Sequence, residues 1–110
     1  MASPKAIDQS APSAAELERA FAELAGEWRS QTAAMSSASQ MARHPAYQRI
    51  IGLGEAVVPL ILRELERRPD HWFRALREIT GDNPVALEDA GKVRKMADAW
   101  LAYGRARGYI

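Results

Sequence analysis

A continuous apolar stripe with helical spacing in the middle of the chain constrains the fold most. Its members recur at i, i+1, i+4, i+5 and i+8: Val57, Val58, Ile61, Leu62 and Leu65. This spacing places all five side chains on one side of a helix, as a stripe wide enough to be buried. Pro59 falls in the opening turn, where its missing N–H costs little. The sequence therefore predicts a buried helix from about residue 57 to residue 68.

A second helix is predicted directly after the first. Pro69 disfavours helical backbone at the residue before it, which ends the first helix. Asp70 can offer its carboxylate to the free N–H groups of the next helix, and Gly81 can take the left-handed conformation that ends it. We therefore expect two antiparallel helices joined by about two residues.

Further helices are predicted on both sides of this pair. Ser13 and Glu16 form a capping box, followed by an apolar edge at i, i+4, i+7 and i+11 that predicts a helix to about Ala34. The residues of this edge are Leu17, Phe21, Leu24 and Trp28. Six residues near the C-terminus share another face and predict a last helix: Val93, Met96, Ala97, Trp100, Leu101 and Gly104. Gly108 should end it, with the last two residues folding back on the helix.

The remaining segments carry weaker signals. Ser37 and Gln40 predict a short helical turn over residues 38–42, and Pro45 opens a helix with a buried face that includes Tyr47. Residues 85–91 are loop or weak helix, and residues 1–12 are predicted to be a disordered leader. The sequence thus predicts an all-α fold, with four or five helices in one domain over residues 13–110.

The central segment resembles the HEAT-like repeats of bacterial helical-repeat proteins. The resemblance rests on the Gly-x-Gly turn at 52–54, AVVPLI at 56–61, REL at 63–65 and ALREITG at 75–81. It covers about residues 45–105, and with Trp28 and the HPAY run at 44–47 the chain is also similar to small bacterial all-α proteins of unassigned function. It implies stacked helices and protein binding, and no catalytic residues. The chain holds at most two helical hairpins, whereas a solenoid needs three or more repeats.

Composition argues against several classes of function. The net charge is +1, which provides no strong overall attraction for nucleic acid. The chain has no cysteine, so disulfides and thiolate chemistry are excluded. No segment approaches the ~20 apolar residues of a membrane span, and the first residues lack the apolar core of a secretory signal. We therefore expect a cytoplasmic protein.

The sequence offers little for catalysis or metal binding. Its two histidines are His44, before a proline, and His71, at the start of a predicted helix, and we interpret both as turn or capping residues. No HxxxH or HExxH spacing is present, and no phosphate-binding glycine loop or nucleophile elbow exists. The prediction is a protein that is not an enzyme and uses no cofactor or metal.

Arginines form the cluster with the most functional potential. They are Arg63, Arg67, Arg68, Arg74 and Arg77. Trp72 and Phe73 are about 100° apart on their helix, so we expect a small bundle to leave one of them exposed. Arginine and tryptophan are common interface anchors, and we therefore predict a protein interface around the turn at Pro69, made of Arg68, His71, Trp72 and Arg74. The alternative is that Trp72 completes the core.

The predicted function is a non-enzymatic protein-interaction module, such as an accessory, antitoxin-like or immunity subunit. Its partner is another protein chain or a second copy of itself. The alternative is a helical nucleic-acid-binding protein that uses the arginine cluster at 63–77. Interspersed acidic residues such as Glu64, Glu66 and Glu78 would cancel much of the field of that cluster and favour the first hypothesis.

Overall fold

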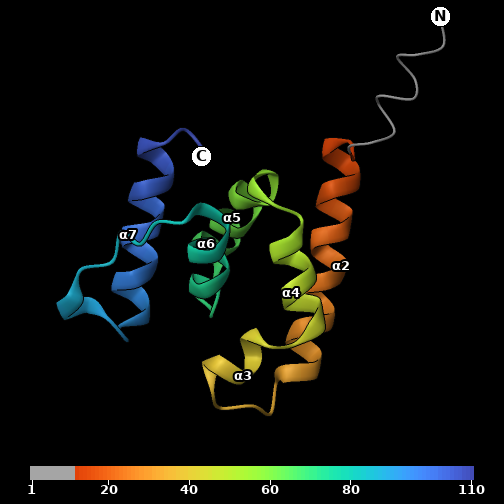
Figure 1. The fold of residues 1–110 in the computed structure, drawn as a ribbon, viewed down its shortest axis with the longest axis horizontal. Helices are drawn as coiled ribbons and strands as arrows, with labels where there is room; N and C mark the ends of the chain where they lie inside the picture. Colours follow the sequence, from red (N-terminus) through yellow and green to blue (C-terminus); the bar gives the residue numbers. More distant parts are fainter. Residues whose placement is uncertain (1–11) are drawn as a thin grey trace, which may run out of the picture.

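Helices account for all the regular structure in residues 12–110, the part of the chain that the computed structural model describes (Figure 1). The α-helices are α2 (Ala14–Thr32), α3 (Ala38–Ala42), α4 (Pro45–Gly52), α5 (Val58–Arg67), α6 (Phe73–Thr80) and α7 (Val93–Ala106). Two 3-10 helices, η1 (Glu55–Val57) and η2 (Leu87–Asp89), complete the order. The all-α prediction is confirmed, but the described residues hold six α-helices rather than four or five. The additional one is α3, the short turn predicted over residues 38–42. The predicted leader falls almost entirely on residues 1–11, outside the described residues.

Local capping signals place the first three helices where the sequence predicted them. The Ser13 hydroxyl accepts from the Glu16 N–H at 3.1 Å, and the Glu16 carboxylate accepts from the Ser13 N–H at 2.8 Å, which completes the capping box of α2. Ser37 accepts from the Gln40 N–H and caps α3. His44 caps α4, because its Nδ1 accepts from the N–H of Ala46 at 3.0 Å.

The connection between α5 and α6 differs from its prediction. It spans residues 68–72 rather than about two residues, and Asp70 does not cap α6. The Asp70 carboxylate instead accepts from the N–H of His71, inside the connector. The N–H of Ala75 lies in the first turn of α6, where the helix offers it no carbonyl, and it donates to the Tyr47 hydroxyl at 3.0 Å. That hydroxyl donates in turn to the His71 carbonyl oxygen at 3.0 Å. A side chain from α4 therefore replaces the local cap.

Aromatic side chains from α2, α4 and the start of α6 form the centre of the core. The Trp72 ring centroid lies 4.6 Å from that of Trp28, 5.6 Å from that of Phe21 and 5.8 Å from that of Tyr47. Such tilted and stacked pairs add stability beyond the area that they bury. Trp72 is fully buried among these neighbours.

The expectation that either Trp72 or Phe73 is exposed is wrong. Trp72 is 0% exposed and Phe73 only 8% exposed. Trp72 packs against α2 and α4, while Phe73 lies toward α7, where it shares a groove with Met96. Two side chains 100° apart are both covered because α6 lies between neighbours on two sides.

The helices are arranged with α2 and α7 at opposite ends and α4, α5 and α6 between them (Figure 1). The closest pairings are α2 with α4, α5 with α7, and α4 with α6. Gly104 allows α7 to approach α5, because a Cβ at this position would lie 2.5 Å from a methyl carbon of Leu62. The predicted core residues Ile61, Leu65 and Trp100 are buried, and Gly81 and Gly108 end their helices at φ 77° and 80°.

Candidate functional site

A surface groove runs between α6 and α7. One part has a volume of about 280 Å³ and is lined by Ala38, Ser39, His71, Phe73, Arg74, Arg77, Gly91, Val93 and Met96. The other part has a volume of about 190 Å³ and is lined by Phe73, Arg77, Asn83, Val85, Ala86, Leu87, Ala90, Met96 and Trp100. Because Phe73, Arg77 and Met96 line both parts, we treat them as one α6–α7 groove.

The α6–α7 groove exists because its two walls pack on different partners. α6 packs mainly on α4, and α7 packs mainly on α5, so α6 and α7 make little direct contact. The segment 81–92 crosses from one wall to the other and contributes Val85 and Leu87 to the groove (Figure 1). The groove therefore has two helical walls and one wall of loop, and Ala38 and Ser39 of α3 also line its first part.

Hydrogen bonds anchor the loop wall at both ends. Asp82 accepts from the Tyr103 hydroxyl of α7 and lies 3.5 Å from an Arg107 nitrogen, while its own N–H donates to the Thr80 hydroxyl. At the other end the Lys92 N–H donates to the Asp89 carbonyl at 2.9 Å, with Gly91 between them at φ 87°. The loop thus has a defined conformation, and its apolar side chains are held at the groove.

The lining of the α6–α7 groove combines apolar side chains with positive charge. Arg74 and Arg77 are its charged lining residues, and no acidic side chain lines either part. Leu87, on the loop wall, is 94% exposed. An exposed leucine alone means little, but here it extends an apolar lining that already contains Phe73 and Met96.

The predicted interface residues are divided by the structure. His71 and Arg74 both line the α6–α7 groove, whereas Arg68 lines a separate cleft described below. Trp72 belongs to the aromatic core and has no exposed surface, so it does not form part of an accessible surface in this conformation. The inclusion of Trp72 in the interface is therefore corrected, and Phe73 takes its place at the groove.

Sequence reasoning did not identify Met96, Leu87 and Phe73 as groove residues. Met96 was assigned to the core face of its helix, and it is in fact partly buried. The available signal was Val85 and Leu87, two apolar residues in an otherwise polar, turn-rich segment. Apolar side chains in such a loop are either folded under it or available to a partner.

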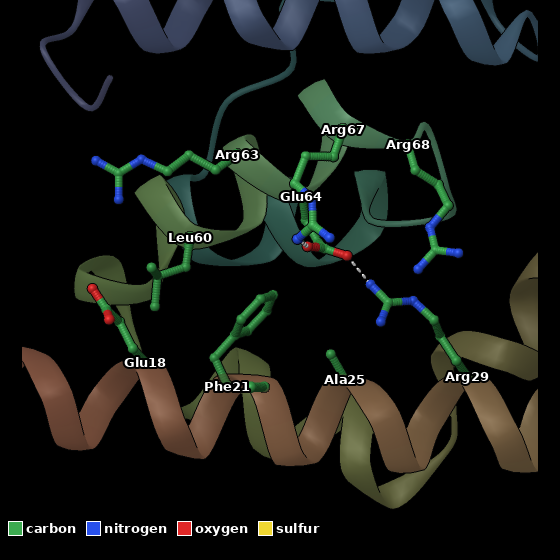
Figure 2. Close-up of a pocket in the computed structure, with 10 residues that line it drawn as sticks. Glu18, Phe21, Ala25, Arg29, Leu60, Arg63, Glu64, Arg67 and Arg68 are labelled. Atoms are coloured by element: carbon green, nitrogen blue, oxygen red, sulfur yellow. Dashed lines mark hydrogen bonds and ion pairs between the residues drawn. The ribbon is translucent and has the colours of Figure 1, made fainter.

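The second concave region is the α2–α5 cleft (Figure 2). It has a volume of about 380 Å³ and is lined by Glu18, Phe21, Ala22, Ala25, Arg29, Leu60, Arg63, Glu64, Arg67 and Arg68. Figure 2 shows Phe21 and Leu60 pointing toward each other across it, with the guanidinium groups of Arg29 and Arg68 on the same side. Four arginines thus surround this cleft.

The carboxylate of Glu64 pairs with two of these four arginines. Arg29 donates to one of its oxygens, and Arg67 donates to the other at 3.0 Å. Glu64 is only 9% exposed, so its carboxylate gives up most of its hydrogen bonds to water. The two bonds from arginine replace them. The Nε of Arg29 lies 4.0 Å from a carboxylate oxygen of Asp70, which ties α2 to the α5–α6 connector as well. This network joins elements of the fold.

The arginine cluster does not form a single row. Arg63, Arg67 and Arg68 line the α2–α5 cleft, whereas Arg74 and Arg77 line the α6–α7 groove, and the two concave regions share no lining residue. A row of phosphate contacts along one strand requires arginines on one continuous face. The geometry therefore offers less support to nucleic-acid binding than to two separate sites.

Three tyrosines of the described chain have raised pKa values, each with a structural cause. Burial raises the pKa of Tyr47, whose hydroxyl is occupied with the backbone of α6. Hydrogen bonds to Asp82 and Glu55 raise the pKa values of Tyr103 and Tyr109. Within residues 12–110, no group of three or more His, Asp or Glu side chains is placed to hold a metal ion.

Comparisons with known proteins add no identification. No protein-family model, curated protein or solved structure matches the chain. Over the described residues, no helix has both the length and the apolar character needed to cross a membrane.

Proposed function

We propose that this protein is a non-enzymatic interaction module that holds a short segment of a partner protein in the α6–α7 groove. One observation carries the proposal: a continuous apolar groove whose arginines are accompanied by no acidic lining residue. Contact of apolar surface with water is unfavourable, so a partner that covers this surface lowers the free energy.

The groove has the composition of known recognition surfaces. Interfaces are enriched in aromatic residues, methionine and arginine, and Phe73, Met96 and Arg77 line both parts of this groove. Methionine also adapts its shape to different partners. Accessory, antitoxin-like and immunity subunits act by binding alone, and we place the protein in this broad class. The resemblance to HEAT-like repeats, which bind proteins, supports the same proposal.

Selection from an unbiased library of displayed peptides tests this function. Peptides about 16 residues long should be enriched on the full-length protein, and they should shift the backbone amide resonances of Phe73, Arg77 and Met96 in NMR spectra. Peptides that perturb only the α2–α5 cleft, or the absence of any enriched peptide, would contradict the proposal.

A matched pair of variants provides the control. Met96→Glu places a carboxylate in the groove, and Ala102→Glu places one on an exposed position of the same helix that lines neither concave region. Met96→Glu should abolish binding, whereas Ala102→Glu should retain it. Melting temperatures measured on the same samples exclude unfolding as the cause.

A further inference from the structure

The charge of the α6–α7 groove limits the kind of segment that fits it. Arg77 lines both parts and makes no ion pair with any described residue. Arg74 uses its Nε to bond Glu78 at 2.8 Å, and the structure gives its two terminal nitrogens no acceptor among the described residues. Both guanidinium groups can therefore receive carboxylates from outside.

The surface next to the groove carries charges of both signs. The first turn of α7 and the residue before it carry Lys92, Arg94 and Lys95, all exposed. Together α6, the 81–92 loop and the first turn of α7 hold five basic residues against four acidic ones, Glu78, Asp82, Glu88 and Asp89. Two of these carboxylates are already bonded, Glu78 to Arg74 and Asp82 to Tyr103, which leaves a small positive excess. A field of this sign attracts acidic segments and repels basic ones.

The backbone of the groove indicates the secondary structure of the occupant. Two walls are α-helices, and beyond their end turns the N–H and C=O groups are already bonded within each helix. An extended strand would find no free sheet edge among residues 12–110, so it could not form the ladder that gives strand addition its affinity. Contact must come from side chains, and a helix presents a stripe of them on one face.

Arginine spacing matches such a helix. Arg74 and Arg77 are three residues apart on α6, so they lie on one face of it, next to Phe73. Two carboxylates spaced three or four residues apart on a partner helix have the same separation. Each can form a charge-assisted hydrogen bond with one guanidinium group while the apolar stripe beside them enters the groove.

We infer that the occupant of the α6–α7 groove is an amphipathic helix of another protein, with acidic residues flanking its apolar stripe. This inference rests on the proposed function and specifies the partner for the same site. It excludes a basic or a neutral segment, which would cover the guanidinium group of Arg77 without giving it an acceptor.

A pair of designed peptides tests this. Both are helical and share one leucine stripe; the first carries glutamate beside the stripe, and the second carries glutamine at the same positions. Binding to the full-length protein is measured by fluorescence anisotropy. The glutamate peptide should bind at least about tenfold more tightly, and its affinity should fall as salt is raised.

Reversing the charge of one arginine tests whether the preference for the glutamate peptide arises in the groove. Arg77→Glu should weaken the glutamate peptide by at least about tenfold and allow a lysine version of the peptide to bind. Arg63→Glu makes the same change of charge on an exposed residue of the α2–α5 cleft. Its effect should stay within about threefold, because Arg63 does not line the groove and salt screens exposed charges that are not in contact.

The outcomes separate the two proposals. If both peptides bind the groove equally, or if peptides selected on the groove are not acidic, the inference is wrong and the proposed function stands. If the glutamate peptide fails to bind, the inference is wrong; if displayed peptides also avoid the groove, the function is wrong as well. Equal losses with Arg77→Glu and Arg63→Glu would indicate general attraction and overturn the inference.

Two other occupants are tested on the same samples. Light scattering over a range of protein concentrations detects a second copy of this chain, and a labelled DNA duplex detects nucleic acid. Dimerisation or duplex binding that Arg77→Glu removes and Arg63→Glu retains would assign the groove to that occupant and overturn the acidic helix.

Discussion

Arginines surround both the α2–α5 cleft and the α6–α7 groove, and the two regions differ in what accompanies those arginines. In the cleft, Glu64 is nearly buried and bonds Arg29 and Arg67 at once. In the groove, no acidic side chain lines the walls, and Arg77 has no ion pair among the described residues. An arginine satisfied internally contributes to the fold, whereas one that lacks an internal carboxylate is available to a ligand. The number of arginines alone does not distinguish these roles.

The largest expected effect comes from the core that separates the two regions. Trp72→Ala removes the centre of the aromatic cluster and should lower the free energy of unfolding by about 3–5 kcal/mol. Chemical denaturation measures this change. Adding Arg74→Ala to the variant should lower stability little further. A loss below about 1 kcal/mol for Trp72→Ala would show that this residue is not part of the core.

Removal of the internal carboxylate should come next. Glu64→Ala leaves Arg29 without its main partner and should cost about 2–3 kcal/mol, less than the ~3–5 kcal/mol of a fully buried pair because Arg29 is partly exposed. Thermal and chemical unfolding check this value. Glu66→Ala, on the exposed side of the same helix, is the matched control and should change stability little. Equal effects of the two substitutions would show that the cleft network is not structural.

Loss of the remote cap on α6 should have a smaller effect. Tyr47→Phe leaves the N–H of Ala75 and the carbonyl of His71 without their partner, at an expected cost of about 1–2 kcal/mol. Tyr109→Phe removes a hydroxyl that bonds an exposed glutamate, Glu55, and should cost little. Amide hydrogen exchange should also be faster in the first turn of α6 in Tyr47→Phe alone. If exchange is unchanged, the hydroxyl does not cap this helix.

The same hydroxyl predicts an alkaline limit to stability. Burial raises the pKa of Tyr47 in the folded state, whereas the unfolded chain ionises near 10, so the folded state holds the proton more tightly. The stability gained from this difference is complete below pH 10 and declines above it by up to about 1.4 kcal/mol per pH unit. Unfolding measured from pH 8 to pH 11 should show a steeper decline for the native chain than for Tyr47→Phe. Parallel curves would contradict the prediction.

The smallest effect on stability is expected in the groove. Arg77→Ala and Leu87→Ala should each change the free energy of unfolding by no more than about 0.5 kcal/mol, because both side chains are exposed. Both should nevertheless weaken peptide binding. A large loss of stability in either variant would show that the groove side chains are needed for folding, as those of the cleft are.

Local chemistry made much of the fold predictable. Ser13, Ser37 and Pro45 act within a few residues of their own positions, and each begins the helix that it was expected to begin. Gly81 and Gly108 end helices for a similar local reason. The apolar stripes also identified Ile61 and Trp100 as core residues, because periodicity alone decides which side of a helix is buried.

The features of the fold that the sequence does not predict depend on contacts between distant parts of the chain. The cap on α6 comes from Tyr47, 28 residues before Ala75, and no pattern near residue 70 indicates it. The groove depends on α6 packing on α4 while α7 packs on α5, which a sequence does not specify. For the candidate site, His71 and Arg74, which the sequence predicts at an interface, line the groove. Trp72 instead lies in the core, which is the alternative that the sequence leaves open for this residue.

The aromatic cluster also gives the protein an internal optical reporter. The rings of Trp28 and Trp72 are 4.6 Å apart at an angle of 44°, close enough for their electronic transitions to couple. Circular dichroism should therefore contain a pair of bands of opposite sign that depends on α2 being docked against the start of α6. Detachment of α2 would remove this pair before the helical signal is lost. Docking of the first helix can thus be followed separately from helix formation, without any attached label.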